Sequence, residues 1–402
     1  MINVAILGYG TVGGGVAEVL NTNTASIAKR VGEELKIKYI LDIREFPGDP
    51  NEAVITKDFD AIVNDAEVKV VCETMGGLNP AYDFTKRLLE AGKSVCTSNK
   101  ELVAAHGPEL LALAKANNCM YLFEASVGGG IPIIRPLLTC LTAEEVGEIM
   151  GILNGTTNYM LTKMDKEGYD YADVLKEAQD NGYAERNPAA DVEGHDACRK
   201  IAILASLNYG KTVNYEDIYT EGINKISKED FDYAGLLDRS IKLIGFCKEE
   251  NGKKYAMVAP FLLEENHPLY AINGVFNGIL VHGNMVDDVV FVGRGAGKLP
   301  TASAVVSDII EEALNIGKAS DIEWVDEKLT LNDKNELKFR YMVRMRGNSA
   351  DGKYKAVFPD AEELNAEIIA GEYAIVTKEM TEGEFLAKYA ELGGAIKFIR
   401  LK

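Results

Sequence analysis

The stretch from Gly182 to Lys200 concentrates the charged side chains that are best placed to do chemistry. Asp196 and Lys200 are four residues apart, and the apolar run after them predicts a helix, so both side chains should lie on one helical face. An acid and a lysine at a helix start can orient a polar substrate and hold the lysine where it exchanges protons. The alternative is a solvated helix start, in which Asp196 favours the helix dipole and Lys200 forms a surface pair. The stretch also contains Tyr183, Glu185, Asp191, Glu193 and Arg199.

A glycine-rich turn follows the first apolar run of the chain, residues 2–7. Gly8, Gly10 and Gly13 fit the pattern G-x-G-x-x-G, and apolar residues then recur at helical spacing. A strand, a tight glycine turn and a helix in this order let the backbone approach a pyrophosphate at the helix N-terminus. The pattern therefore predicts a dinucleotide site, with an ordinary strand-to-helix turn as the alternative.

The second predicted strand ends in a mixed signal for the choice of cofactor. Asp42 at this position would bind the ribose hydroxyls of NAD, whereas Arg44 would pair with the 2′-phosphate of NADP. Leu41, the residue before Asp42, cannot bind a phosphate. We expect Asp42 at the strand end and Arg44 in a loop that faces away, which favours NAD, or dual use with NAD ahead. A simple loop acid is the alternative for Asp42.

Strands and helices alternate through the first third of the chain. Strands are expected at about 68–74, 93–98 and 119–126, and helices at about 80–91 and 108–117. This alternation predicts an α/β fold with a doubly wound parallel sheet. Ligands bind at the carboxyl ends of such strands, where Thr74 and Lys100 are placed. For Lys100, a surface position in a loop is the alternative.

Residues 124–131 combine a carboxylate with a glycine-rich turn. Glu124 and the carbonyls of Val127, Gly129 and Ile131 could ligate a hard cation through oxygen. The spacing alone favours a glycine-rich hinge instead.

A second part of the chain begins near Pro136, and residues 148–161 predict a strand, a polar turn and a helix. The turn, residues 154–158, offers amides, hydroxyls and backbone N–H groups for the charged ends of an amino acid. The alternative is a helix start capped at Thr156 or Thr157. Further on, Asn251-Gly252 predicts a hairpin within a mostly antiparallel sheet that has helices on one face.

The composition of the chain limits the classes of protein to which it can belong. The chain has 402 residues, of which 47 % are hydrophobic and 26 % are charged, as in globular proteins of two or three domains. A net charge of −19 argues against a nucleic-acid partner. Six scattered cysteines without a CxxC pair indicate buried thiols in a reducing cytosol, so we expect a cytoplasmic location. No apolar run reaches the roughly 20 residues of a membrane span, and a first strand at Ile2 leaves no room for a signal peptide.

Seven segments resemble the homoserine dehydrogenase family in order and spacing: GYGTVGGGV, SNK, EASVGGGIPII, GILNGTTNY, GYAE, ADVEGHDACRK and GRGAGKLPTASAV. The resemblance covers about residues 1–315. It implies an enzyme that reduces L-aspartate 4-semialdehyde to L-homoserine with NADH or NADPH, on the pathway to threonine and methionine.

The resemblance also implies roles for individual residues. Lys200 would be the proton donor, with Lys100 contacting cofactor and substrate. The residues implied around the substrate are Gly155, Thr156, Tyr183, Glu185, Asp191 and Asp196. Those implied for the dinucleotide are Gly8, Gly10, Thr11, Val12 and Gly13, with Gly182 and Gly297 on its nicotinamide side. The family's monovalent cation, usually sodium, would bind Glu124, Val127, Gly129 and Ile131 and support the hinge.

These signals predict a dinucleotide-binding domain at 1–135 and a catalytic and dimerisation domain at 136–298. A helix at 299–319 would return to the first domain, and an ACT-like domain would occupy 320–402. This tail lacks the Asp-x-Pro-Gly-Val effector turn of the family's ACT-type regulatory domain, so weak or absent threonine feedback is expected. A homodimer or homotetramer is expected.

Two other functions stay open. A related dehydrogenase could act on another small aldehyde or amino acid, and assays of homoserine against related alcohols would separate the two. A non-catalytic dinucleotide-sensing protein would bind cofactor without turnover, but the joint presence of Lys100, Asp196 and Lys200 argues against it.

Overall fold

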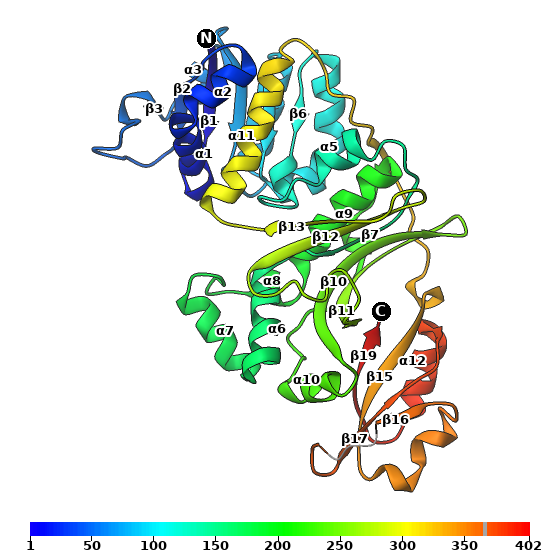
Figure 1. Cartoon of the computed structure of the whole chain (residues 1–402). Helices are drawn as coiled ribbons and strands as arrows, with labels where there is room; N and C mark the ends of the chain where they lie inside the picture. Colours follow the sequence, from blue (N-terminus) through cyan, green and yellow to red (C-terminus); the bar gives the residue numbers. More distant parts are fainter. Residues whose placement is uncertain (365–367) are drawn as a thin grey trace. The chain divides into compact units, whose positions relative to one another are not determined.

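The computed structural model describes residues 1–364 and 368–402 and divides into two compact units (Figure 1). Unit 1 comprises Met1–Glu145, Ala202–Tyr215 and Phe291–Leu329, and unit 2 comprises Val146–Ile201, Glu216–Val290 and Thr330–Lys402. Each unit has its own sheet and its own hydrophobic core.

The sheet of unit 1 is parallel throughout, with strand order β3-β2-β1-β4-β5-β6. Its strands are β1 (Ile2–Leu7), β2 (Leu35–Leu41), β3 (Ile55–Thr56), β4 (Val68–Glu73), β5 (Ser94–Thr97) and β6 (Tyr121–Leu122). The apolar runs of β1 and β4 are almost wholly buried, as expected for strands covered by helices on both faces. The predicted doubly wound α/β fold is therefore confirmed. Strand β6 is shorter than expected, because a 3-10 turn at Glu124–Ser126 ends it.

Helix α11 (Lys298–Leu314) packs beside α1 (Thr11–Thr22), although the two are far apart in sequence (Figure 1). Gly15 makes this close approach possible, because a Cβ there would lie 2.8 Å from the Lys298 carbonyl oxygen. The other helices of the sheet layer are α2 (Thr24–Val31), α3 (Phe59–Val63), α4 (Ala81–Glu90) and α5 (Lys100–Ala116). Unit 1 also contains the small pair of β8 (Lys211–Thr212) with β14 (Val325–Lys328).

Helix α5 starts eight residues earlier than predicted. Its N-cap is Asn99, whose side chain accepts a hydrogen bond from the backbone N–H of Leu102, and Pro108 lies inside the helix. The expectation of a start at Pro108 is wrong because an asparagine cap satisfies the first helical N–H groups well before the proline. Lys100 is consequently a first-turn residue of a helix rather than a loop residue.

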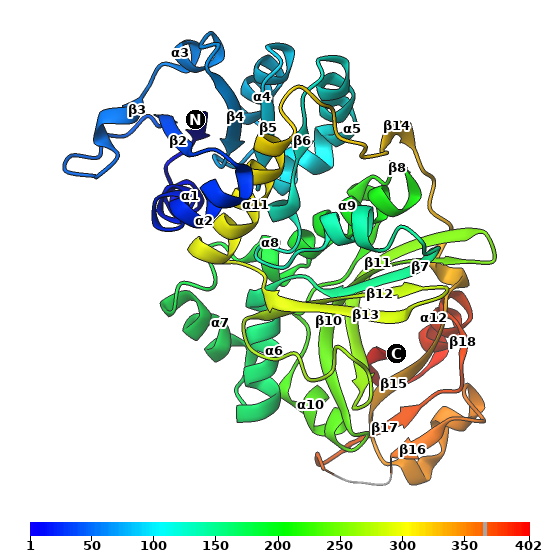
Figure 2. The same cartoon turned by 45° about the horizontal axis from the view of Figure 1, so that its top comes forward.

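Unit 2 is built on a larger sheet, with order β13-β12-β7-β10-β11-β19-β15-β17-β16 in the described part of the chain (Figure 2). Its main strands are β7 (Val146–Ile152), β10 (Arg239–Glu250), β11 (Lys253–Glu264), β12 (Phe276–Gly283), β13 (Asp287–Arg294), β15 (Lys338–Arg346), β16 (Glu362–Leu364), β17 (Glu372–Val376) and β19 (Ala395–Leu401), and the short β9 (Tyr219–Thr220) and β18 (Met380–Thr381) pair at its side. The predicted hairpin is confirmed, since Asn251 and Gly252 both have positive φ between β10 and β11.

The helices of unit 2 lie before, within and after the charged stretch of residues 182–200. They are α6 (Gly155–Glu167), α7 (Tyr171–Asp180), α8 (Ala189–Val192), α10 (Lys228–Gly235) and α12 (Glu382–Glu391). Helix α9 (His195–Tyr209) begins in unit 2 and continues into unit 1. The helix predicted after Asp196 is thus confirmed. The start of α6 is capped by Asn154, so the expected cap at Thr156 or Thr157 is wrong.

The tail extends the sheet of unit 2. Strand β19 pairs in parallel with β11 through Phe261↔Arg400 and Leu262↔Leu401, and antiparallel with β15. Between β15 and β16 the chain forms the 3-10 turns Ser349–Asp351 and Lys353–Ala356. The buried guanidinium of Arg400 donates hydrogen bonds to Glu382 of α12 and to Glu221.

Two further expectations concern the whole chain. Among the described residues, none of the helices combines the length and the apolar character needed to cross a membrane. The six cysteines are unbridged thiols in the described structure, and all except Cys140 are buried, as predicted.

Candidate active site

The glycine turn after β1 has the geometry that a pyrophosphate requires. Gly8 adopts φ +90°, and a Cβ on Gly13 would lie 1.9 Å from the Gly8 carbonyl oxygen, so neither position accepts a side chain. A Cβ on Gly10 would meet nothing within 4 Å, which leaves the start of α1 open to an approaching anion. Thr11 and Val12 form the first turn of that helix.

Thr74 braces this turn from the end of β4. Its hydroxyl donates to the carbonyl oxygens of Leu7 and Gly8, at 3.0 and 2.9 Å. The preceding residue, Glu73, is wholly buried, and its carboxylate accepts hydrogen bonds from the Met75 N–H and the Thr97 hydroxyl. Burial raises the pKa of Glu73. Sequence reasoning missed Glu73, because an acid at the end of an apolar strand gives no sign of partners on the next strand.

Asp42 and Arg44 form an ion pair at the end of β2. The Arg44 guanidinium donates to both carboxylate oxygens of Asp42 and to the Tyr9 carbonyl oxygen. The backbone N–H of Tyr9 also donates to Asp42. The hydrogen bond from Arg44 holds the pKa of Asp42 well below its usual range. The expectation that Arg44 faces away is therefore wrong, because Asp42 and Tyr9 together fix its side chain over the glycine turn.

Lys100 and Gly297 also belong to unit 1. Lys100 is half-buried in the first turn of α5, directly after the cap Asn99, which donates to the Gly77 carbonyl oxygen. Gly297 is the N-cap of α11 and adopts φ +123°, where a side chain would be strained.

A buried ion pair forms the centre of the polar cluster in unit 2. The Lys200 ammonium lies 2.8 Å from Asp196 Oδ2 and 2.8 Å from the Leu153 carbonyl oxygen. Both side chains are almost fully buried, with exposed fractions of 10 % and 7 %. The Asn154 amide donates to the same Asp196 oxygen and to Asp191. The solvated helix start is excluded, because a surface pair would leave both charges in water.

The other predicted substrate residues are less buried. Thr156, in the first turn of α6, donates its hydroxyl to the Tyr183 carbonyl oxygen at 2.6 Å. Gly155 has no room for a side chain, because a Cβ would lie 2.9 Å from the Val275 carbonyl oxygen. Gly182 has φ +73°, and Tyr183 and Glu185 follow it on an exposed loop. The structure therefore brings together Asp191, Asp196 and Lys200, and leaves Glu185 facing solvent.

The Glu124 carboxylate is buried against the backbone that follows the glycine-rich turn. It accepts hydrogen bonds from the backbone N–H groups of Ile133, Ile134 and Arg135. A carboxylate oxygen can accept more than one such bond, so the place of Glu124 in a cation site stays a prediction. The carbonyls of Val127, Gly129 and Ile131 likewise stay predicted ligands.

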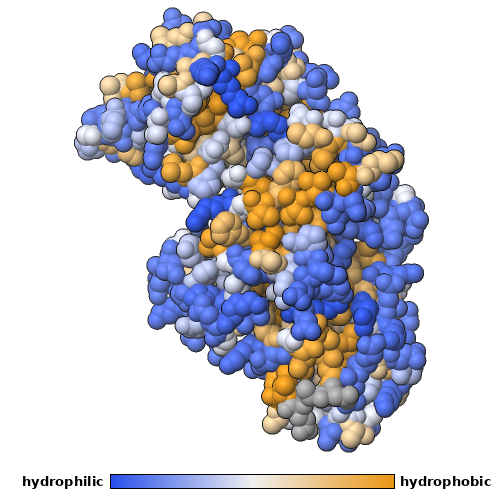
Figure 3. All heavy atoms as spheres, in the orientation of Figure 1, coloured by the Kyte–Doolittle hydropathy of each residue, from blue (hydrophilic) through white to orange (hydrophobic). Residues whose placement is uncertain are grey.

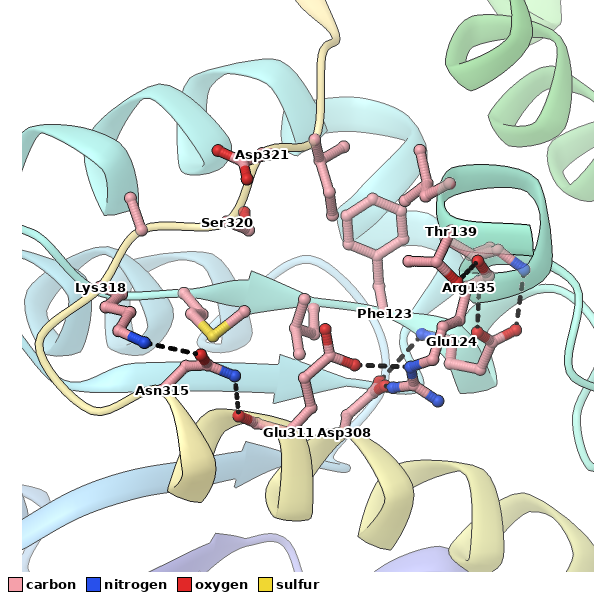
Figure 4. Close-up of a pocket in the computed structure, with 16 residues that line it drawn as sticks. Phe123, Glu124, Arg135, Thr139, Asp308, Glu311, Asn315, Lys318, Ser320 and Asp321 are labelled. Carbon is pink, nitrogen blue, oxygen red and sulfur yellow. Dashed lines mark hydrogen bonds and ion pairs between the residues drawn. The ribbon is translucent and has the colours of Figure 1, made fainter. Parts of the chain in front are cut away.

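A cavity of about 470 Å³ lies beside Glu124 in unit 1 (Figure 4). Figure 4 shows the Arg135 side chain directed at Asp308 and Glu311 of α11, which it contacts at 2.6 and 2.5 Å. Glu124 alone among the predicted site residues lines this cavity. The ion pairs of Arg135 join the segment after the glycine-rich turn to α11.

Two family models match the chain. The model of the homoserine dehydrogenase NAD-binding domain matches residues 8–124, and that of homoserine dehydrogenase matches residues 132–310. The chain is 42 % identical to the homoserine dehydrogenase of Bacillus subtilis (strain 168) over 319 residues, which are 78 % of this chain and 73 % of that protein.

Solved structures extend the likeness to the tail. A homoserine dehydrogenase from Thiobacillus denitrificans superposes with a TM-score of 0.90 at 32 % identity, covering 100 % of this chain and 98 % of that one. A hyperthermophilic archaeal homoserine dehydrogenase in complex with NADPH gives a TM-score of 0.67 at 29 % identity, covering 79 % of this chain and 99 % of that one. Together with the glycine turn and the Lys200 cluster, these matches show that the chain belongs to the homoserine dehydrogenase family.

Proposed function

We propose that the chain reduces L-aspartate 4-semialdehyde to L-homoserine, reversibly, with a nicotinamide dinucleotide as hydride carrier. The observation that carries the proposal is the buried Lys200–Asp196 pair at the start of α9. Taking two charges out of water costs free energy that a surface pair does not lose, so the burial of this pair supports a chemical task for Lys200. Family membership names the substrate class.

The residues of unit 1 fit a dinucleotide. The open space over Gly10 and the N-terminus of α1 suit the pyrophosphate. Asp42 at the end of β2 suits the ribose hydroxyls. When bound, the nicotinamide supplies the hydride, and the protein orients and polarises the substrate.

Lys200 then acts on the oxygen of the substrate. Hydride addition to an aldehyde carbon leaves negative charge on oxygen, which a nearby ammonium stabilises and protonates. Leu153 and Asp196 take two of the three N–H bonds of Lys200, and the third is left for the substrate oxygen. We assign the substrate ammonium to Glu185 and Asp196, and a contact to cofactor and substrate to Lys100.

The test is oxidation of L-homoserine by the full chain, followed at 340 nm with NAD and with NADP. Related amino alcohols such as L-serine and L-threonine serve as matched substrates. A kcat/KM for homoserine at least 100-fold above theirs supports the proposal. Faster oxidation of another alcohol would assign a different small substrate, and cofactor binding without turnover of any alcohol would assign a dinucleotide sensor.

Self-association is part of the proposal. We propose a homodimer or homotetramer, because apolar side chains stay exposed at the end of the sheet where β13 is the edge strand. Met285 and Val286, in the β12–β13 turn, are 80 % and 45 % exposed, and Figure 3 shows apolar surface over these strands. Light scattering after gel filtration measures the mass, and a monomer at micromolar concentration would contradict the proposal.

A further inference from the structure

We propose that His282, Asp287 and Asp288 bind a divalent first-row transition-metal ion, Zn²⁺ before others, at the turn between β12 and β13. All three residues belong to unit 2, and their ligand atoms lie close together. None of them is among the residues assigned above to the dinucleotide or the substrate. Metal binding at this turn does not depend on the proposed function.

The three side chains come from the two ends of one hairpin connection. His282 is the last residue but one of β12, and Asp287 and Asp288 are the first two residues of β13. Consecutive residues of a regular strand point to opposite faces of a sheet, which would separate the two aspartates. Asp287 instead adopts φ +64° where the turn meets the strand, and both carboxylates reach the same histidine.

The distances fit one ion with three protein ligands. His282 Nδ1 lies 2.8 Å from Asp288 Oδ1 and 3.5 Å from Asp287 Oδ1, and the three ligand atoms lie within 4.8 Å of one another. Because zinc binds nitrogen and oxygen at about 2.0–2.2 Å, two ligands at octahedral or tetrahedral angles lie roughly 3.0–3.5 Å apart. Small rotations of these exposed side chains therefore bring all three atoms to one ion.

The charges favour a divalent cation over a simple surface ion pair. A histidine carries at most one positive charge, whereas the two aspartates carry two negative charges. Neither aspartate makes an ion pair with a lysine or an arginine in the described part of the chain. At least one negative charge at this turn is thus left uncompensated, and a divalent ion compensates both.

Neighbouring charged groups have other partners. Glu148 lies opposite His282 in the β7–β12 ladder, and Lys402 binds its carboxylate at 2.6 Å. His267, which is within electrostatic reach of Asp288, accepts a backbone N–H with Nδ1, so its other nitrogen carries the hydrogen of the neutral ring. The site therefore offers one imidazole nitrogen and two carboxylate oxygens, and water completes the coordination of the ion.

This ligand set selects among metals. Imidazole suits zinc and other first-row transition metals, whereas Mg²⁺ and Ca²⁺ take oxygen ligands. Affinity for a site with nitrogen and oxygen ligands also rises from Mn²⁺ to Zn²⁺. We therefore expect Zn²⁺ to bind more tightly than Mn²⁺, and Mg²⁺ to bind most weakly.

The first measurement is calorimetric titration of the untagged full chain, freed of metal by dialysis against a chelator, with Zn²⁺, Mn²⁺ and Mg²⁺. Cys140→Ser serves as the background, because Cys140 is exposed and zinc binds thiolates. About 0.1 M sodium chloride screens weak binding to other surface acids. We expect one zinc site per chain. Zn²⁺ that binds only at millimolar concentration, or no more tightly than Mg²⁺, would overturn the proposal.

Variants then locate the site. His282→Ala removes the nitrogen ligand, and Asp288→Asn removes a charged oxygen ligand. Each should weaken Zn²⁺ binding by at least about tenfold, since even residues that only orient a ligand contribute about 10- to 100-fold to metal affinity. His106→Ala is the matched control, because His106 Nδ1 lies 3.5 Å from a single carboxylate, that of Glu109. Unchanged affinity in His282→Ala, or an equal loss in His106→Ala, would overturn the assignment.

A crystal of the Cys140→Ser protein soaked in zinc gives a direct view. Anomalous scattering should place one ion about 2.0–2.2 Å from His282 Nδ1 and from an oxygen of each aspartate. The peak should vanish in His282→Ala and persist in His106→Ala. A zinc ion bound elsewhere, with none at this turn, would refute the proposal.

Discussion

The ammonium of Lys200 and the carboxylate of Asp196 lie 2.8 Å apart, one helical turn from each other in α9 and both buried. In the proposed function this pair combines a chemical and a structural task. Substitution of the lysine would remove the proposed proton donor and also leave an acid buried with one donor fewer.

Lys200→Ala should therefore lower kcat by about 10²–10⁴, the usual loss for a positioned acid. It should also lower the unfolding free energy by roughly 1–3 kcal/mol, because Asp196 loses a charged partner. Lys200→Arg is the matched control, since a guanidinium restores the charge but does not release a proton near neutral pH. Steady-state kinetics and urea unfolding measure the two effects. A kcat within a few-fold of wild type for either variant would end the role of Lys200 as proton donor.

Cofactor choice should depend on the Asp42–Arg44 pair. In Asp42→Ala we expect kcat/KM with NAD to fall and that with NADP to rise, because the carboxylate that repels a 2′-phosphate is gone and Arg44 is released to pair with it. In Arg44→Ala we expect the use of NADP to fall most. Wild type is predicted to use NAD at least as well as NADP. A wild-type preference for NADP of tenfold or more that Arg44→Ala erases would show that Arg44, and not Asp42, decides.

Lys242 should make the stability of the protein depend on pH in the alkaline range. Its side chain is 1 % exposed, and burial lowers its pKa to about 8, against about 10.4 in an unfolded chain. Between these values the unfolded chain binds more protons, so the unfolding free energy should rise with pH. Relative to Lys242→Met, wild type should gain up to about 3 kcal/mol across this window. Urea unfolding at pH 7 to 10.5 tests this, and a constant difference between the two proteins would contradict it.

Arg400 and Glu382 should be strongly coupled in the tail. Their exposed fractions are 1 % and 0 %, and the guanidinium donates to both carboxylate oxygens. Arg400→Met should lower the unfolding free energy by roughly 3–5 kcal/mol, because it leaves a buried carboxylate with less compensation. The double variant with Arg400→Met and Glu382→Met should lose less unfolding free energy than the sum of the two single changes. Chemical denaturation of the four proteins measures the coupling. Additive costs would mean that the pair does not act as a unit.

Threonine should inhibit weakly or not at all, since the effector turn is missing from the tail. The measurement is activity over 0–20 mM threonine. Deletion of residues 320–402 is an unsuitable control, because it removes β19 from the sheet beside β11. Inhibition at sub-millimolar threonine would show that the tail binds an effector without that turn.

Local patterns predicted the parts of the site that depend on neighbours in sequence. The turn at Gly8, Gly10 and Gly13 follows from residues within one strand and one helix, and the Asp196–Lys200 pair follows from helical spacing alone. The parts that failed depend on distant partners. Asn154 reaches Asp191 and Asp196 across 37 and 42 residues, and Arg44 is fixed by Tyr9 across 35. No periodicity reports such contacts, because the chain is brought together there by the packing of whole elements.

The place of β19 has a consequence for how the chain is made. One side of β11 pairs with β10 within a local hairpin. On β11 the earlier strand β9 also pairs with Met257 and Val258, whereas Phe261 and Leu262 pair with β19, about 130 residues further along. At the usual pace of synthesis, on the order of 5–20 residues per second, that part of the edge stays open for roughly 7–26 seconds. During this interval it can pair with a strand of another nascent chain. Coexpressed chaperones should therefore raise the soluble yield of this protein.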